Sequence, residues 1–196
     1  MTTINSAARI IKRQAGFTMI EVLVALIIIV LGLLGLAGMQ VRMQQAEFES
    51  YQRTQALILL YDMVDRINTH RVTASCFAFT SGTGTPYLGV SANASPACAV
   101  SDATNNAAAV TSMNEWSSLL QGAAVSGNAG AMVGARGCVS LNAGVYTVAV
   151  AWQGTVDTSE PKMDDGLTTI NCGNGQYGNE TRRRAVVTTF RIADLS

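Results

Sequence analysis

The sequence predicts an α+β fold in which a long N-terminal α-helix, apolar in its first half, packs on a small antiparallel sheet. Two observations predict it. A long apolar run near the N-terminus leads into a second segment with helical periodicity, and the clearest strand patterns gather in the last third of the chain. A small sheet has to bury one face against another element, and the long helix is the element available for it.

Composition excludes several classes of protein. The 196 residues suffice for one domain or two small ones, and 48% hydrophobic with only 13% charged residues excludes a largely disordered chain. The 13 basic and 13 acidic residues cancel, so no global basic field attracts nucleic acid. One histidine and four widely spaced cysteines leave little material for a metal enzyme or a serine hydrolase. We predict a protein that works by assembly, without catalysis and without a cofactor.

Residues 17–39 form an apolar segment in which Glu21 is the only ionisable residue. A helix of this length is about 34 Å long, enough to cross a hydrocarbon core of roughly 30 Å. Three basic residues and no acid precede it, which holds that end in the cytoplasm and places the chain after Met39 outside: Arg9, Lys12 and Arg13. No small-residue cleavage site follows the run, so an uncleaved signal anchor is one interpretation.

Glu21 favours a second interpretation. A carboxylate inside a membrane segment costs roughly 2.5–3.5 kcal/mol on insertion scales, and this segment contains no Lys or Arg to pair with it. Cutting the chain between Gly16 and Phe17 would create an α-amino group. On a helix that starts at Phe17, this amine lies one turn from Glu21, or near the same carboxylate of a neighbouring helix.

The run GFTMIEVLVAL, from Gly16 to Leu26, resembles the N-terminal signature of type IV pilins and of the related pseudopilins of type II secretion. The resemblance implies that a prepilin peptidase removes residues 1–16 as a leader and methylates the new N-terminal Phe17. It also implies that Glu21 meets the N-terminal amine of a neighbouring subunit.

Three glycines lie late in the apolar run: Gly32, Gly35 and Gly38. Each costs about 1 kcal/mol relative to alanine in a helix. Small residues spaced by three also allow membrane helices to approach closely. In assembled pili of the family that the chain resembles, the corresponding stretch loses helical structure, and the glycines would ease that loss. Both interpretations stay open.

Residues 40–70 predict an amphipathic continuation of the helix, because neither Gly nor Pro interrupts them. A single helix from Phe17 to about His70 would span about 81 Å. Acid-before-base pairs four residues apart support an exposed face, Glu49 with Arg53 and Asp62 with Arg66. An apolar stripe recurs at helical spacing: Ala56, Leu60, Met63, Val64 and Ile67.

The stretch from Tyr51 to Ile67 also resembles the continuation seen in PilV-type minor pilins, the type IV pilus modification proteins. There a Gln-Ala-x-x-Leu pattern leads to Asp-Met-x-Asp-Arg, which this chain supplies with Asp62, Met63, Asp65 and Arg66. The solvated face of an ordinary amphipathic helix explains the same charges.

Residues 71–196 predict an exported globular domain. A long loop with one short strand, Cys76 to Thr80, comes first. A short helix follows, with Ser112 and Glu115 spaced as a capping box and with an apolar face of Trp116, Leu119 and Leu120. Strands are expected at the end of the domain, at 137–141 and 145–152 as a hairpin and at 185–192.

All four cysteines lie in this exported domain, where an even count predicts two disulfides. Three pairings are possible. We favour the pairing that closes one loop each in the regions poorest in regular structure, with Cys76 bound to Cys98 and Cys138 bound to Cys172. Each would contribute roughly 3–4 kcal/mol by loop entropy.

Few residues are candidates for chemistry. His70 stands at a helix end, where it can meet unsatisfied carbonyls. An acidic loop could hold Ca²⁺ but lacks EF-hand spacing, and its residues are Asp157, Glu160, Asp164, Asp165 and Gly166. A basic run could touch phosphates but has no neighbouring aromatic residues, and its residues are Arg182, Arg183 and Arg184. We expect neither a metal nor a nucleic-acid partner.

The resemblance implies a minor pilin of a type IV pilus that helps initiate pilus assembly, joins a tip complex and supports adhesion and twitching motility. The implied partners are prepilin peptidase, other minor and major pilins, the inner-membrane assembly platform and membrane lipid. The implied location is the bacterial inner membrane, with the C-terminal domain in the periplasm, and then the pilus on the cell surface. A type II secretion pseudopilin, a membrane-anchored periplasmic binding domain or enzyme, and a DNA-uptake pilin are the alternatives.

Overall fold

The computed structural model describes residues 16–122 and 132–193, and these residues have the predicted α+β layout. A four-stranded antiparallel sheet has the strand order β1-β2-β3-β4. Contacts divide the chain into two compact units, with the boundary between Gln44 and Gln45 inside the first helix. The elements are α1 (Met19–Thr69), η1 (Arg71–Phe77), β1 (Leu88–Gly89), α2 (Ala103–Leu120), β2 (Arg136–Asn142), β3 (Val145–Gln153), η3 (Glu180–Arg182) and β4 (Arg183–Phe190).

Helix α1 buries the stripe that its periodicity predicts. In the second unit Ala56, Leu60, Met63 and Ile67 are at most 1% exposed, whereas Val64 is only partly buried. Gln52 extends the stripe by one turn, and its buried side-chain amide has no hydrogen-bond partner among the described residues. The apolar stripe belongs to one core with α2 and one face of the sheet.

The strand predicted at Cys76–Thr80 is wrong, because the chain continues after α1 as the 3₁₀ helix η1. Phe77 ends that helix and is fully buried in the core. Thr80 instead forms two hydrogen bonds with β2: its N–H donates to the carbonyl of Val139 (2.8 Å), and its hydroxyl accepts from the Val139 N–H (3.0 Å). The short strand of this region is β1, where Leu88 pairs with Gly137.

Helix α2 begins nine residues before the predicted capping box. Asp102 caps it by accepting a hydrogen bond from the Asn105 N–H (2.9 Å). Ser112 and Glu115 therefore lie inside the helix and form no capping box. Trp116 is fully buried and donates its indole N–H to the carbonyl of Leu59 in α1 (2.8 Å), which joins the two helices.

The predicted hairpin is confirmed, with β2 and β3 each slightly longer than expected. Asn142 pairs with Val145 across a two-residue turn, and both turn residues have positive φ, 47° at Ala143 and 76° at Gly144. The last strand, expected at 185–192, is confirmed with a shift of two residues: β4 begins at Arg183, because Arg183 and Arg184 pair with the end of β3.

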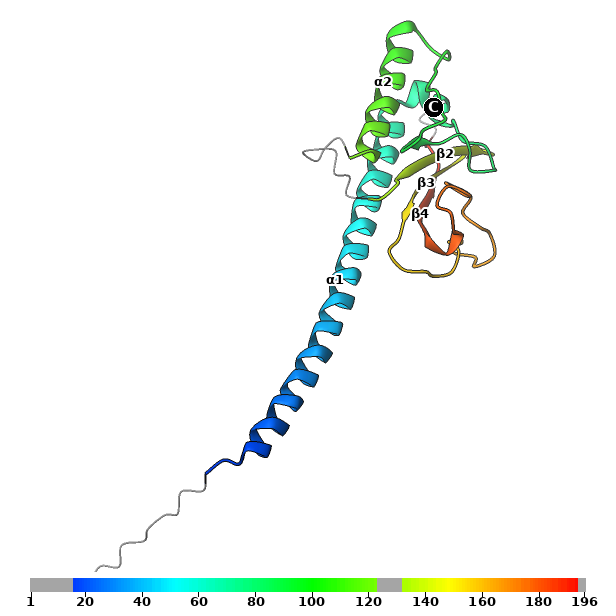
Figure 1. The fold of residues 1–196 in the computed structure, drawn as a ribbon. Coiled ribbons are helices and arrows are strands. Elements are labelled where there is room, and N and C mark those ends of the chain that lie inside the picture. Colours follow the sequence, from blue (N-terminus) through cyan, green and yellow to red (C-terminus); the bar gives the residue numbers. More distant parts are fainter. Residues whose placement is uncertain (1–15, 123–131, 194–196) are drawn as a thin grey trace, which may run out of the picture. The chain divides into compact units, whose positions relative to one another are not determined.

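The two faces of the sheet are covered differently (Figure 1). Helix α2 and the last turns of α1 cover one face, and Gly137 of β2 lies so close to Trp116 that a Cβ there would come within 2.0 Å of the indole ring. The loop between β3 and β4 covers the other face with Ile170, Cys172 and Tyr177. Two disulfides are present. Cys76–Cys98 joins η1 to the segment before α2, and Cys138–Cys172 joins β2 to the loop between β3 and β4. This is the pairing favoured by the sequence analysis.

Candidate functional site

The peptide bond between Gly16 and Phe17 lies in exposed, irregular backbone. Gly16, Phe17 and Thr18 precede the helix, and Phe17 is 80% exposed. No atom within 4 Å would meet a Cβ built on Gly16. A peptidase has to hold its substrate in an open conformation, because a helical bond is enclosed by the hydrogen bonds of its own turn. This bond is therefore available without unfolding any helix.

Thr18 precedes helix α1, which begins at Met19, two residues later than the predicted start at Phe17. The Thr18 hydroxyl accepts a hydrogen bond from the Glu21 N–H (3.3 Å), and the Thr18 carbonyl accepts from the N–H groups of Glu21 (3.1 Å) and Val22 (3.3 Å). A Thr followed three residues later by Glu is a capping-box pattern, a signal that could have located this start. Phe17 therefore lies outside the helix, in exposed irregular backbone.

Glu21 lies in the first turn of α1. The helix macrodipole is positive at this end and favours a carboxylate there by roughly 0.3–1 kcal/mol. Among the ion pairs of the described residues none involves Glu21. The carboxylate is thus exposed and held near the N-terminal end of an apolar rod.

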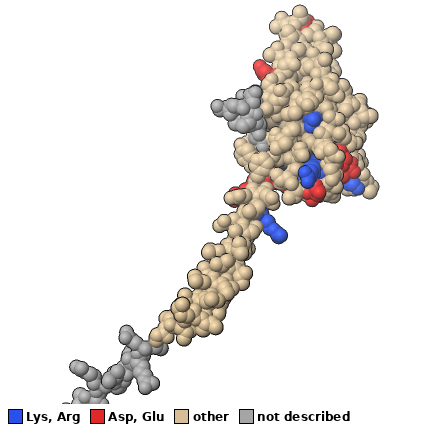
Figure 2. Space-filling view, viewed as in Figure 1, with Lys and Arg blue, Asp and Glu red and all other residues tan. Residues whose placement is uncertain are grey.

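Apart from Glu21, residues 19–39 present an apolar surface. Every large apolar side chain from Met19 to Met39 is at least 47% exposed, and the helical rod in Figure 2 is drawn almost entirely in tan, the colour of uncharged residues. Among the described residues α1 is the one helix long and apolar enough to cross a membrane. Its three glycines lie within unbroken helix, and no other group lies within 4 Å of where their Cβ atoms would be: Gly32, Gly35 and Gly38.

Arg66 is the last residue of the Asp-Met-x-Asp-Arg pattern and makes the most contacts of its charged residues. Its guanidinium binds Asp62 (2.8 Å), and one of its nitrogens donates to Glu115 (3.0 Å) and to the Ser112 carbonyl (3.0 Å). The predicted Asp62–Arg66 pair is therefore present, and Arg66 also joins α1 to α2. Met63 is fully buried, whereas Asp65 is exposed. His70 lies with Nδ1 2.9 Å from the carbonyl of Arg66, at the helix end as expected.

Each of the three arginines of the basic run forms an ion pair with a carboxylate of the same chain. Arg183 is fully buried between Glu160 and Glu180 and also donates to the carbonyls of Ile170 and Cys172. Arg182 pairs with Asp157 (2.9 Å). On the visible face of the globular unit, acidic and basic side chains lie next to one another (Figure 2). These arginines balance local carboxylates and form no free basic patch.

The acidic loop likewise makes separate contacts. Asp157 and Glu160 bind arginines, and Asp165 accepts hydrogen bonds from the N–H groups of Leu167 (2.9 Å) and Thr168 (2.8 Å). Hydrogen bonds from Thr168 and Leu167 lower the pKa of Asp165. Within 16–122 and 132–193, no three acidic, His or Cys side chains gather as metal ligands would.

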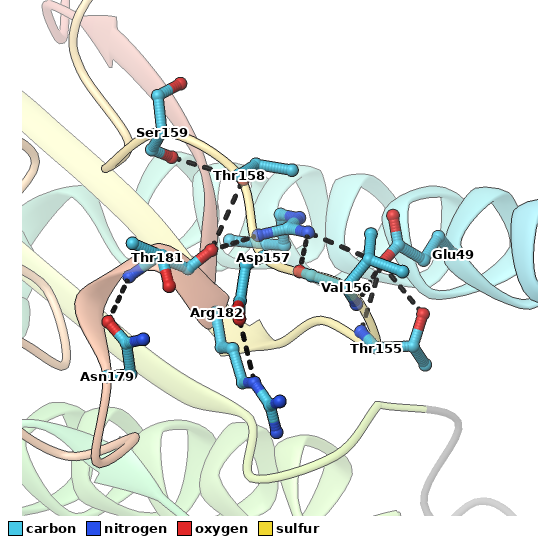
Figure 3. Close-up of polar contacts among 10 residues, drawn as sticks. Glu49, Thr155, Val156, Asp157, Thr158, Ser159, Asn179, Thr181 and Arg182 are labelled. Atoms are coloured by element: carbon cyan, nitrogen blue, oxygen red, sulfur yellow. Dashed lines mark hydrogen bonds and ion pairs between the residues drawn. The ribbon is translucent and has the colours of Figure 1, made fainter.

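Glu49 was predicted to pair with Arg53, and this is wrong. Its carboxylate accepts hydrogen bonds from the Thr155 N–H (3.0 Å), the Thr155 hydroxyl (2.9 Å) and the Val156 N–H (3.3 Å), and it lies 3.4 Å from Arg184. Figure 3 shows Glu49 reaching from α1 to Thr155 and Val156 of the loop after β3. These partners lie more than 100 residues away in the chain, so helical spacing could not find them.

The environment keeps Glu49 ionised. Partial burial alone would raise its pKa, but the hydrogen bonds from Thr155 and Val156 and the charge of Arg184 outweigh burial and lower the pKa. This carboxylate connects α1 to the end of the sheet through one loop, so it positions the second half of the helix within the globular unit.

A family model, the prokaryotic N-terminal methylation motif, matches residues 11–37. Comparisons with curated proteins and with solved structures found no match. The motif supports a type IV pilin-like prepilin or pseudopilin that is processed by a prepilin peptidase, and proteins with this motif are structural and not catalytic. Together with the apolar helix α1, it fits a membrane-anchored pilin.

Proposed function

We propose that this chain is a minor pilin of PilV type, made as a prepilin, held in the inner membrane and then incorporated into a type IV pilus. The observation that carries the proposal is the methylation motif placed on an exposed helix start: an open Gly16–Phe17 bond, a carboxylate in the first helical turn, and an apolar rod with no buried side of its own. The apolar rod contacts lipid while the chain is in the membrane, and it contacts neighbouring subunits after incorporation into the filament.

Three residues of the chain take part in the proposed processing and pairing: Gly16, Phe17 and Glu21. Prepilin peptidase binds the open backbone at Gly16 and cuts before Phe17, which removes residues 1–16 and creates an α-amine that is then methylated. The new amine lies close to the first turn of α1, where Glu21 provides the negative charge. In a medium of low dielectric, this pairing favours one axial register between neighbouring helices.

The N-terminus of the protein extracted from membranes tests the processing step. Intact-mass analysis is expected to find a chain that begins at Phe17 with one added methyl group. Gly16→Leu should leave residues 1–16 attached, because a bulky side chain obstructs the open backbone at the cut. Gly32→Leu is the matched control and should be cut normally. A wild-type chain that keeps Met1 or Arg9 would refute prepilin processing.

The role of Glu21 is tested separately. Glu21→Gln should be inserted and cut like the wild type, since removing a charge lowers the cost of insertion, but it should appear in sheared filaments about tenfold less. Asp164→Asn, which removes an exposed acid from the loop between β3 and β4, is the control and should be incorporated normally. Equal incorporation of the two variants would contradict pairing by Glu21.

A type II secretion pseudopilin is the second candidate, because the same methylation motif serves both classes. Genes for a pilus retraction motor beside the gene for this chain would favour the pilus. Genes for a secretin and exoproteins, without such a motor, would favour secretion. The pilus proposal includes several roles: helping to initiate assembly, joining a tip complex with other minor and major pilins on the inner-membrane platform, adhesion and twitching.

A further inference from the structure

Helix α1 has a second apolar face in the globular unit, opposite its buried stripe. Tyr51, Thr54, Ile58 and Tyr61 follow one another at intervals of three, four and three residues, which is the spacing of a coiled-coil seam. We call these four residues the outer seam. Tyr51 is 52% exposed, Ile58 53% and Tyr61 58%. On the other side of the helix the residues that we call the inner stripe are at most 1% exposed: Ala56, Leu60, Met63 and Ile67.

The outer seam is not needed for the fold. The inner stripe already attaches α1 to α2 and the sheet, and none of the four seam residues belongs to either core. The hydroxyl of Thr54 donates to the carbonyl of Ser50 (3.0 Å), so it needs no further partner. Leu57, 37% exposed, widens the apolar surface on one side. A row of large apolar side chains on a solvent face marks a contact surface.

Charges at both ends of the outer seam restrict what can cover it. The next positions of the same spacing are Glu47 and Asp65, both exposed. Beside Asp65 lies a shallow hollow of about 500 Å³ whose charged lining is Asp62, Asp65, Arg66 and Glu115. Arg66 pairs with both Asp62 and Glu115, but its single positive charge cannot offset three carboxylates, and Asp65 has no ion pair among the described residues. This end of the seam therefore carries excess negative charge and suits a Lys or Arg side chain of a partner.

Insertion into the membrane by the N-terminal segment determines the orientation of the partner helix. Under the proposed function, on which this step rests, neighbouring subunits enter the membrane by their N-terminal segments, so their helices run parallel. Two copies of this chain in register would oppose Asp65 with Asp65 and Glu47 with Glu47, and like charges at facing seam positions disfavour such a pair.

We propose that the outer seam docks the parallel helix of a different membrane-anchored subunit, one with an apolar seam and basic residues opposite Asp65 and Glu47. Shape complementarity at Tyr51, Ile58 and Tyr61 provides the contact area, and the acidic ends select a partner of opposite charge and set its register. The surface would thus discriminate against a second copy of this chain.

Site-specific photo-cross-linking in the native cells tests the proposal. Ile58→p-benzoylphenylalanine in the full chain should give a major product containing one other chain, identified by mass spectrometry, which has its own apolar N-terminal helix and a Lys or Arg in the facing segment. The matched control is Leu167→p-benzoylphenylalanine, at an 83% exposed apolar position on a loop, which should give at least about tenfold less of that product.

Charge reversal tests how the partner is chosen. Asp65→Lys should reduce the Ile58 cross-link about tenfold, whereas Asp65→Asn should reduce it less, since it removes attraction without adding repulsion. Reversing the facing basic residue of the partner to Glu should restore the yield with Asp65→Lys. A product made of two copies of this chain, or a yield unchanged by Asp65→Lys, would overturn the proposal.

The same cells separate this inference from the proposed function. If the chain begins at Phe17 and still gives no cross-link at position 58, the inference fails and the proposed function stands. If the chain keeps residues 1–16, the proposed function fails, and the parallel arrangement on which the inference depends fails with it.

Discussion

The two parts of helix α1 have the same secondary structure and opposite burial. From Met19 to Met39 every large apolar side chain is at least 47% exposed, whereas Ala56, Leu60, Met63 and Ile67 are at most 1% exposed. The second part buries its apolar stripe against α2 and the sheet of the same chain. The first part has no partner among the described residues, so its stability depends on lipid or on other subunits. Under the proposed function, one continuous helix thus serves both for folding and for assembly.

The largest effect expected from this comparison comes from shortening the same residue in each part. Leu60→Ala should lower the free energy of unfolding of the globular unit by about 2.7–5 kcal/mol, because it leaves a cavity in the core. Leu34→Ala, at a 64% exposed position, should change it by less than about 0.5 kcal/mol. Denaturation of the full chain in detergent, followed by tryptophan fluorescence, measures both, and equal losses would contradict the division.

The second disulfide gives the next largest effect. Cys138→Ala with Cys172→Ala should lower the free energy of unfolding of the globular unit by roughly 3–4 kcal/mol, because the bond closes a loop of 34 residues. The helical content of the detergent-bound apolar segment should not change, since it contains no cysteine. Circular dichroism beside the fluorescence measurement separates the two parts, and a parallel loss of helix would show that they depend on each other.

Glu49 gives a smaller effect with a defined dependence on pH. Its pKa in the folded protein is lowered below the ordinary value of 4.5, so its stabilisation is fully present above about pH 4.5 and is lost as the pH falls through the folded pKa. Glu49→Gln should cost about 1–2 kcal/mol at neutral pH and progressively less below pH 4.5. Glu47→Gln is the control, and a cost for Glu49→Gln that does not change with pH would exclude ionised Glu49 as the cause.

The smallest effect on the globular unit is expected from Gly35→Ala. No atom lies within 4 Å of the added Cβ, so the unfolding of the globular unit should not change. The apolar helix should gain about 1 kcal/mol, which slows the hydrogen exchange of amides around Gly35 about fivefold in detergent. If a loosened helix is required for assembly, filament incorporation should fall as exchange slows. Full incorporation with slowed exchange would contradict the interpretation that assembly requires a loss of helix at the glycines.

Local patterns were sufficient for the parts of the fold that local interactions decide. The inner stripe, the hairpin and its turn at Ala143–Gly144 follow from periodicity and turn chemistry. The predictions for Cys76–Thr80 and for the Ser112–Glu115 capping box failed for one reason. Each prediction rested on a short local pattern, but residues of that pattern bind partners far away in the chain. Thr80 binds Val139, and Ser112 binds Arg66.

The candidate site divides in the same way. The motif around Gly16, Phe17 and Glu21 is continuous in the sequence, so it is visible without a structure, and Thr18 could have been found by its capping pattern. The outer seam can also be read as a heptad spacing, but only the burial of the opposite face shows which of the two apolar stripes of α1 remains exposed.

By itself the sequence determined that an apolar, singly charged segment follows a basic N-terminal segment and that an α+β domain comes after it, because hydropathy and periodicity act over neighbouring residues. Only the tertiary structure decided that Glu49 and the three arginines are tied into the globular unit and that one face of α1 stays exposed beside an acidic hollow. Those contacts join residues up to 135 positions apart, and no local pattern encodes which distant partner a charged side chain meets.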